Sequence, residues 1–466
     1  MARRLRWLFE TDHPHLLWWQ RLLGDIHYNY RKKFILDIFI RGYFSDSAKR
    51  RKELAKQIGF HPPSVMLFSV TQNCNFNCAG CWAHNYDVKE ELTYEQWRKV
   101  LKEARDEIGI HLFSVVGGEP FIRPDFLDLT EEFSDCAFMT FTNGSLLTDK
   151  VIERLKKNGN VYPMLSINGW RETNDAVRGK GSFDMLMEKM DRLRKAGILF
   201  GASLTATSKN AEEIASDEFL QMLCDKGAMS TWTFHYVPVG ENPDPSLLTT
   251  PEQRELLRMA TVNARNTLPM FTVDFWGDAP MILGCIAGGK QYFHVNSRGD
   301  IEPCAFVHFA THNVKTSTII EGLKSEFMTA IRNGIPYDNN MLRPCMIVDR
   351  AEALREYYEK YKPYETHRGA ADYITREDIK EQIDRYAEKV KAVMDKKWEE
   401  GLFMTAMPLE GEYYHDRYSL CSAARPAGGV HGGCEKIRKE PKGCNCARSS
   451  RALKGYIDDL QQEFAR

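Results

Sequence analysis

Between residues 64 and 270, short apolar runs alternate with segments of helical length, and this alternation restricts the fold more than any other feature of the chain. The apolar runs cover residues 65–70, 112–116, 138–141, 161–167, 200–207 and 231–239. Helical patterns, such as those over 93–108 and 183–196, separate most of them. Strands that alternate with helices form parallel βαβ units. The pattern predicts an α/β fold, a partial (β/α)6 TIM-like barrel, with its chemistry in the loops that follow the strands.

The composition is that of a globular chain and excludes several other classes. Of the 466 residues, 43% are hydrophobic and 27% are charged, which argues against general disorder. A net charge of −1 argues against a nucleic-acid partner, and 12 cysteines are too few for a disulfide scaffold of this length. No apolar run is long enough for a membrane helix, and the first residues do not resemble a secretion signal. We expect a cytoplasmic protein with reduced thiols.

Four regions differ in composition. Residues 1–60 are basic and aromatic, residues 61–270 contain the expected barrel, and residues 271–350 carry three widely spaced cysteines and a hairpin pattern. Residues 351–466 begin with charged helical sequence and end in a tail that contains Cys421, Cys434, Cys444 and Cys446. These four cysteines could bind a further cluster or zinc, or be exposed thiols.

Directly after the first run, Cys74, Cys78 and Cys81 have the spacing C-x3-C-x2-C. Three thiolates on one short loop can hold three irons of a [4Fe–4S] cube and leave the fourth iron open for a ligand. The alternatives are a zinc loop or buried thiols. Zinc loops usually pair two C-x2-C units, and no partner pair lies nearby in the sequence.

A C-x3-C-x2-C motif after the first strand of a βα barrel resembles the radical S-adenosylmethionine (SAM) superfamily. The resemblance implies that the open iron chelates SAM and that one electron cleaves it. A 5′-deoxyadenosyl radical then abstracts hydrogen from a substrate carbon. It further implies two cofactors, the [4Fe–4S] cluster and SAM, and a reductant such as ferredoxin or flavodoxin.

Residues after the next strands resemble the SAM-binding segments of that superfamily. Gly117-Gly118-Glu119-Pro120 is similar to its GGEP loop, which binds the amino group of SAM, and residues 142–144 are similar to its TNG segment. Arg178-Gly179 is similar to its RG pair, in which the arginine pairs with the carboxylate of SAM. The resemblance thus assigns SAM binding to Gly117, Gly118, Glu119, Asn143, Ser166, Asn168 and Arg178.

One position departs from the superfamily pattern. The residue before the third cysteine is often an aromatic side chain that contacts adenine, but here it is Gly80, and Trp82 is the candidate substitute. At the end of the sixth run, His235 and Tyr236 are candidates for proton or radical transfer in the barrel mouth, although core packing explains Tyr236 equally well.

Cys285, Cys304 and Cys345 form a second candidate metal site. A hairpin pattern lies between the first two, and the arrangement resembles the SPASM and twitch extensions, which bind auxiliary [4Fe–4S] clusters. The shorter twitch type is favoured because only Cys345 follows. Asp349 and His308 are candidates for a fourth ligand, or the position is open to substrate. The alternative is three buried cysteines in a small core.

The amino-terminal 44 residues contain Trp7, Trp18 and Trp19 among many basic side chains. This composition is typical of a helix that lies on a membrane surface, which would make the protein peripheral to the inner membrane. The alternative is a helix that caps the barrel. Three functions therefore stay open: hydrogen abstraction from a lipid chain, maturation of a peptide or protein, and a non-catalytic iron–sulfur carrier.

Overall fold

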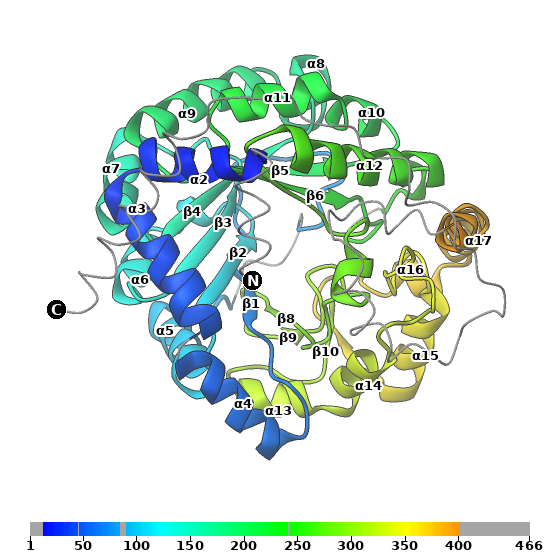
Figure 1. Ribbon diagram of the computed structural model, residues 1–466. Helices are drawn as coiled ribbons and strands as arrows, with labels where there is room; N and C mark the ends of the chain where they lie inside the picture. Colours follow the sequence, from blue (N-terminus) through cyan, green and yellow to red (C-terminus); the bar gives the residue numbers. More distant parts are fainter. Residues whose placement is uncertain (1–12, 45, 84–89, 241–242, 401–466) are drawn as a thin grey trace, which may run out of the picture.

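The computed structural model describes residues 13–44, 46–83, 90–240 and 243–400. Its centre is a nine-stranded sheet in the order β7-β6-β5-β4-β3-β2-β1-β8-β9 (Figure 1). Seven neighbouring strands, β1 to β7, run parallel in chain order. The nine strands are β1 (Val65–Thr71), β2 (Leu112–Gly117), β3 (Ala137–Thr142), β4 (Val161–Ile167), β5 (Gly201–Ala206), β6 (Ser230–His235), β7 (Phe271–Asp274), β8 (Tyr292–Val295) and β9 (Ile301–Glu302).

The partial barrel expected from the sequence is confirmed, with two differences. The sixth strand ends at His235, four residues earlier than expected, because its partner β5 ends at Ala206, the residue that pairs with His235. A seventh parallel strand, β7, follows it. The helices outside the sheet are α5 (Tyr94–Glu103), α6 (Phe126–Glu132), α7 (Asp149–Asn158), α8 (Arg171–Arg178), α9 (Ser182–Ala196), α10 (Ala211–Ile214), α11 (Asp217–Asp225) and α12 (Pro251–Thr267).

The main core lies between the sheet and these helices. Phe68 on β1 packs on Trp97 of α5 with ring centroids 5.0 Å apart, and Phe113 on β2 stacks on Phe138 of β3. All four side chains are fully buried. Because neighbours along a strand point to opposite faces, the residues between them face the barrel interior. Thr93 fixes the start of α5 with a capping box.

The amino-terminal helices α2 (Pro14–Gly24), α3 (Tyr28–Lys33) and α4 (Asp46–Ile58), with the π-helical segment η1 (Phe34–Phe44) between α3 and α4, pack on the barrel (Figure 1). Trp18 donates its indole N–H to the carbonyl of Met229 just before β6, and buried Tyr30 donates to the carbonyl of Val161 at the start of β4. Arg21 donates to three carbonyls near the end of α11 and the start of β7. These helices therefore close the amino-terminal end of the barrel. None of the helices in the described ranges has the length and apolar character to cross a bilayer.

The carboxyl-terminal region continues the same sheet. β8 pairs with β1 in parallel, with Val65 opposite Tyr292, and β9 pairs antiparallel with β8. The remaining elements are β10 (Phe309–Ala310), α13 (Ile319–Lys324), α14 (Glu326–Gly334), α15 (Ala351–Tyr361), β11 (Tyr364–Glu365), α16 (Asp372–Thr375) and α17 (Glu377–Glu399). They enclose a second core around Phe309, Phe327 and Leu354. The sheet thus runs through both regions that composition separates at residue 270.

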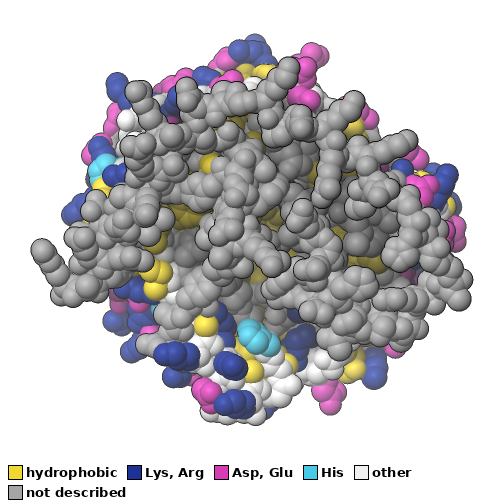
Figure 2. Space-filling model, in the orientation of Figure 1, with side chains coloured by type: hydrophobic (Ala, Val, Ile, Leu, Met, Phe, Trp, Pro, Cys, Tyr) yellow, Lys and Arg dark blue, Asp and Glu magenta, His cyan; other side chains and the backbone are white. Residues whose placement is uncertain are grey.

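Both basic and acidic side chains are visible around the rim of the face that Figure 2 shows. This distribution matches the balance of 63 basic and 64 acidic residues in the sequence.

Candidate active site

The loop after β1 carries Cys74, Cys78 and Cys81, and the carboxylate of Glu91 fixes the backbone at its start. The carboxylate of Glu91 accepts hydrogen bonds from the backbone N–H of Gln72 at 2.6 Å and from the hydroxyl of Thr71 at 2.9 Å. Cys74 is exposed, and the other two cysteines are half-buried. The loop is therefore fixed at its start, and the thiol of its first cysteine, Cys74, is exposed to solvent. Sequence reasoning missed the role of Glu91, which lies far along the chain from the motif.

The electrostatics of this loop suit a group that brings positive charge. Burial is the main cause that raises the pKa of the Cys81 thiol to about 11, and Cys78 and Cys74 raise it further. Partial desolvation of the sulfur by the surrounding loops likewise raises the pKa of Cys74. Iron binds thiolates, and three of them on one loop match the ligand number of a cube with an open corner. Among the described residues, no three His, Cys, Asp or Glu side chains converge as ligands of a single metal ion do.

Gly117 and Gly118 let the loop after β2 touch the cysteine loop. A Cβ on Gly118 would lie 2.0 Å from the carbonyl oxygen of Asn73, and one on Gly117 would lie 2.2 Å from that of Thr71. Two backbone hydrogen bonds join the loops, from Gly118 N–H to Thr71 at 2.9 Å and from Glu119 N–H to Asn73 at 2.7 Å. Only glycine permits this approach.

Glu119 joins the GGEP-like loop to the TNG-like segment. Its fully buried carboxylate accepts hydrogen bonds from the Thr142 hydroxyl at 2.8 Å and from the Asn143 backbone N–H at 2.8 Å. Burial raises the pKa of Glu119 to about 7, although these hydrogen bonds and Arg178 oppose the rise. A buried acceptor that is half-ionised near neutral pH suits an ammonium group, whose charge would favour the carboxylate.

Asn143, Asn168 and Arg178 lie around the cysteine loop. Asn143 donates to the side chain of Asn75 at 2.9 Å, and its amide nitrogen is 3.9 Å from the sulfur of Cys74. Arg178 donates from Nε to the side-chain oxygen Oδ1 of Asn168 at 2.6 Å, and its Nη1 is 3.9 Å from the sulfur of Cys78. The sequence motifs predicted this convergence. Ser166 lies on the interior face of β4, opposite Ser203 of β5.

His235 does not face the barrel mouth, so this expectation is wrong. Its side chain points to the same face of β6 as those of Thr231 and Thr233. These two threonines line a small cavity with Leu257 of α12. Its Nε2 lies 3.3 Å from a carboxylate oxygen of Asp274, and its Nδ1 lies 3.2 Å from the Thr249 hydroxyl. Successive side chains of a strand point to opposite faces. Because Trp232 and Phe234 point to the barrel interior, His235 points outwards.

Tyr236, and not Trp82, is the aromatic residue beside Gly80. A Cβ on Gly80 would lie 3.2 Å from the Tyr236 ring, and Gly80 has φ +71°. The Trp82 ring packs instead on Phe306, with centroids 5.7 Å apart, and on His294 and His308. Trp82 therefore connects the first cysteine loop to the second. Tyr236 also accepts a hydrogen bond from the Asp244 backbone at 3.2 Å.

Cys285, Cys304 and Cys345 come together in the second core. Each of the three is half-buried or buried and lies in or against the second core, and Cys285 raises the pKa of both Cys304 and Cys345. Burial raises the pKa of Cys304 to about 12. These thiols, like those of the first loop, suit a group that carries positive charge.

The two residues expected to complete this second site are engaged elsewhere. Both carboxylate oxygens of Asp349 accept hydrogen bonds from Arg254 of α12, at 2.5 and 3.2 Å, and one accepts from the Cys345 backbone N–H at 3.1 Å. Nε2 of His308 forms a hydrogen bond with the carbonyl oxygen of Ala305 at 3.0 Å, and its ring stacks on that of His367. Asp349 therefore anchors the Cys345 loop to the barrel. Cys421, Cys434, Cys444 and Cys446 lie outside the described residues.

A hydrogen-bonded trio that the motifs did not reveal lies between the two cysteine loops. The Ser69 hydroxyl is 2.9 Å from Nε2 of His294, and Nδ1 of His294 is 2.5 Å from the carboxylate of Glu302. All three side chains are fully buried. The trio joins β1 to the β8–β9 hairpin. A glutamate within the apolar hairpin pattern was the only sequence signal for it.

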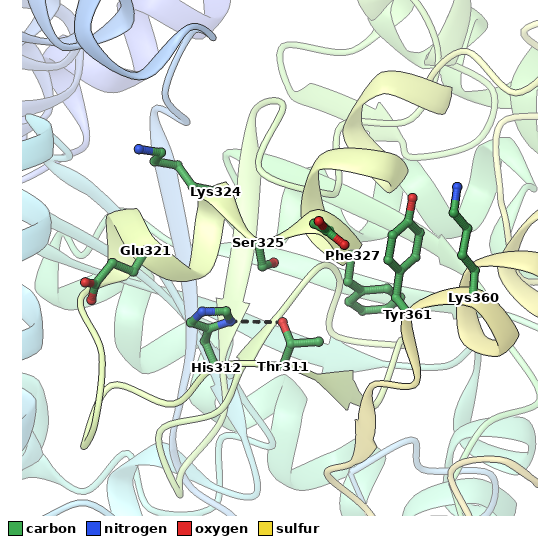
Figure 3. A pocket seen from close by; sticks show the side chains of 9 residues that line it. Thr311, His312, Glu321, Lys324, Ser325, Phe327, Lys360 and Tyr361 are labelled. Atoms are coloured by element: carbon green, nitrogen blue, oxygen red, sulfur yellow. Dashed lines mark hydrogen bonds between the residues drawn. The ribbon is translucent and has the colours of Figure 1, made fainter.

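One cavity lies apart from these residues. It has a volume of about 570 Å³ and opens beside α13 and α15, where His312 contacts Thr311 (Figure 3). Lys324, Lys360 and Tyr361 also line it. None of the residues that the sequence assigns to a site contributes to this cavity.

Comparisons with known proteins agree with this geometry. The radical SAM superfamily model matches residues 68–214. The AdoMet-dependent heme synthase of Methanosarcina barkeri is 26% identical over 282 residues, 54% of this chain and 80% of that protein. The mycofactocin maturase MftC of Mycolicibacterium smegmatis is 30% identical over 175 residues, 36% of this chain and 44% of that protein.

The fold resembles that of a solved radical SAM enzyme. Streptococcus suis SuiB bound to S-adenosylmethionine superposes with a TM-score of 0.52 at 18% identity, over 61% of this chain and 71% of SuiB. The residues 68–214 that match the superfamily model include the first cysteine trio and the loops around it. Residues 68–214 therefore form a radical SAM domain, and the chain is an enzyme that depends on a [4Fe–4S] cluster and SAM.

Proposed function

We propose that this enzyme abstracts a hydrogen atom from an apolar carbon chain, such as the acyl chain of a lipid. When bound, the cluster supplies the electron that cleaves SAM, and the adenosyl group so released takes hydrogen from the substrate. The protein binds both cofactors, orients the substrate and keeps water out. The amino-terminal helices close one end of the barrel, which leaves the end that carries the cysteine loop for substrate entry.

The cofactor-binding roles follow from the geometry of the site. Cys74, Cys78 and Cys81 would hold the cluster. Glu119 would accept a hydrogen bond from the amino group of SAM, and Arg178, which lies close to Cys78, would pair with its carboxylate. Asn143, Ser166 and Asn168 would contact the rest of SAM as the motif resemblance suggests. Tyr236 takes the place of the missing aromatic residue beside Gly80.

An aromatic wall inside the barrel carries the proposal for an apolar substrate. Phe141 of β3 lies 6.3 Å from Trp232 and 5.7 Å from Phe234, both of β6, measured between ring centroids. Since β4 and β5 separate these strands in the sheet, the contacts cross the barrel interior. Phe275, just after β7, stacks on Phe234 at 4.4 Å. All four rings are half-buried.

Among the described residues, the interior positions of β4 to β7 include no charged side chain. The register places Ser166, Ser203, Thr205, Trp232, Phe234 and Val273 on the interior face of β4 to β7. A wall of aromatic, hydroxyl and aliphatic groups binds hydrocarbon through apolar contact and offers no partner for a substrate's charge. A hydrocarbon chain is therefore the substrate class that fits it best.

Deuterium transfer tests the proposal. The anaerobically reconstituted, reduced enzyme is incubated with SAM and phospholipid vesicles whose acyl chains are perdeuterated, and the 5′-deoxyadenosine is analysed by mass spectrometry. Deuterium in 5′-deoxyadenosine supports the proposal. Formation of 5′-deoxyadenosine without label refutes it. The Phe234→Ala variant should lose label transfer but retain SAM cleavage, whereas Trp170→Ala, at an exposed ring outside the barrel, should change neither.

An auxiliary cluster is the second part of the proposed function. Cys285, Cys304 and Cys345 would hold it, close to the first cysteine loop through the contact between Trp82 and Phe306. Two [4Fe–4S] cubes predict about eight irons per chain. Iron analysis of the triple variant Cys285→Ala/Cys304→Ala/Cys345→Ala should find about half that number, and an unchanged count would refute the assignment.

Peptide maturation is the second candidate, and the similarity to mycofactocin maturase MftC favours it. In this case deuterium would transfer from a labelled peptide and not from lipid.

Membrane contact belongs to the lipid proposal, and Leu17 on α2 is 48% exposed. If α2 meets the membrane surface, Leu17→Glu should reduce co-sedimentation with anionic vesicles, because it removes apolar area and adds negative charge. The matched change Leu256→Glu, at a 40% exposed position on α12, should leave it unchanged.

A further inference from the structure

Tyr292 lies against one of the three cysteines of the proposed auxiliary site. Its hydroxyl donates a hydrogen bond to the sulfur of Cys304 at 3.0 Å. Tyr292 begins β8, and its pairing with Val65 of β1 fixes its position relative to the barrel. The hydroxyl is therefore held by the sheet and not by a surface loop.

Two further tyrosines, half-buried Tyr337 and buried Tyr373, lie near the same cysteines, but neither donates a hydrogen bond to a cysteine sulfur among the described residues. Tyr337 donates to the Ile331 carbonyl at 3.3 Å and to the Met346 sulfur at 3.3 Å. Tyr373 on α16 is 1% exposed, and its hydroxyl has no hydrogen-bond partner among the described residues. Tyr373 thus provides a matched phenol that shares the environment and lacks the contact.

The position of the Tyr292 oxygen distinguishes a hydrogen-bond donor from an iron ligand. Ligands on different irons of a cube point towards different corners and so diverge from one another. An oxygen only 3.0 Å from the Cys304 sulfur is placed to donate to that sulfur and not to bind a separate iron. A donor at a thiolate stabilises the negative charge that accumulates when the cluster is reduced. Hydrogen bonds to cluster sulfurs are among the factors that set the reduction potential.

We propose that Tyr292 is a positioning residue that donates a hydrogen bond to Cys304 and raises the reduction potential of the auxiliary cluster, so that this cluster accepts an electron. The inference rests on the auxiliary cluster of the proposed function. A cluster held there, next to the first cysteine loop through Trp82 and Phe306, would take the unpaired electron of the substrate radical while that radical loses a proton to solvent, and an external acceptor such as an oxidised ferredoxin would take the electron from the cluster.

A redox titration followed by electron paramagnetic resonance tests this role in the full chain. Wild type, Tyr292→Phe and Tyr373→Phe are reconstituted anaerobically, and the midpoint potential of each cluster is measured. We expect Tyr292→Phe to move one midpoint to a more negative potential by about 59 mV or more, a tenfold change in the one-electron equilibrium. The other midpoint, and both midpoints of Tyr373→Phe, should stay at the wild-type value.

Three results would overturn the inference. These are an unchanged pair of midpoints in Tyr292→Phe, an equal shift in Tyr373→Phe, and the loss of about four irons from Tyr292→Phe, which would make Tyr292 a ligand. The iron content of the wild type separates this inference from the proposed function. If the wild type binds only one cube, the auxiliary-cluster assignment itself fails, whereas two cubes with unchanged midpoints refute only the role of Tyr292.

Discussion

Replacing Gly118 with alanine should separate the two loops that form the proposed SAM site. The added Cβ would lie 2.0 Å from the carbonyl oxygen of Asn73, 2.4 Å from its carbonyl carbon and 2.6 Å from the carbonyl oxygen of Gln72. Carbon atoms in contact are normally about 3.5 Å apart or more. The neighbouring atoms are backbone and cannot rotate away, so the loop after β2 must move by more than about 1 Å.

The cost of this displacement in folding stability and in SAM affinity can be estimated. Overpacking a core typically costs about 1–3 kcal/mol of folding stability, and rigid backbone neighbours place this change at the upper end. The hydrogen bonds from Gly118 to Thr71 and from Glu119 to Asn73 would lengthen as well. A lost hydrogen bond to a charged group is worth about 1.5–3 kcal/mol, which corresponds to about 10- to 150-fold weaker SAM binding if Glu119 moves away from the amino group.

Equilibrium dialysis of SAM against reconstituted protein measures the binding loss, and thermal unfolding measures the stability loss. Gly24→Ala is the matched control, because no atom lies within 4 Å of a Cβ at this exposed helical position. The control should bind SAM like the wild type. If Gly118→Ala also bound SAM with wild-type affinity, the close approach of the two loops would have no role in holding Glu119.

Three further predictions follow from the same contacts. Because the pKa of Glu119 is raised to about 7, its carboxylate is ionised above that pH. SAM affinity should therefore fall about tenfold per pH unit below 7, and Glu119→Gln should remove this dependence in binding titrations. Asp349→Asn should lower the free energy of unfolding by about 3–5 kcal/mol, because it leaves the Arg254 charge buried and unpaired, and a chemical denaturation curve that matches the wild type would contradict this. Changing Cys74, Cys78 and Cys81 together to alanine should abolish formation of 5′-deoxyadenosine in mass-spectrometric assays, and intact turnover would refute the assignment of the catalytic cluster.

The sequence alone predicted the barrel and the loops at its carboxyl end. Six apolar runs became β1 to β6, because strand alternation and helix length are local properties of the chain. The cysteine spacing and the GGEP-like loop led to the proposed SAM site for the same reason, since each motif occupies one loop. Parallel strands then bring these loops to one edge of the sheet, so Glu119 meets Asn143 as the motifs implied.

Only the tertiary structure decided which partner each side chain has across the molecule. His235 turns towards Asp274, Trp82 turns towards Phe306, and Asp349 is held by Arg254. Each choice depends on a strand face or on an element far away in the sequence, which spacing cannot reveal. The contact between Tyr292 and Cys304 exists because β8 pairs with β1 and the hairpin returns the chain beside it. Local pattern sets which groups are available, whereas long-range packing sets which of them meet.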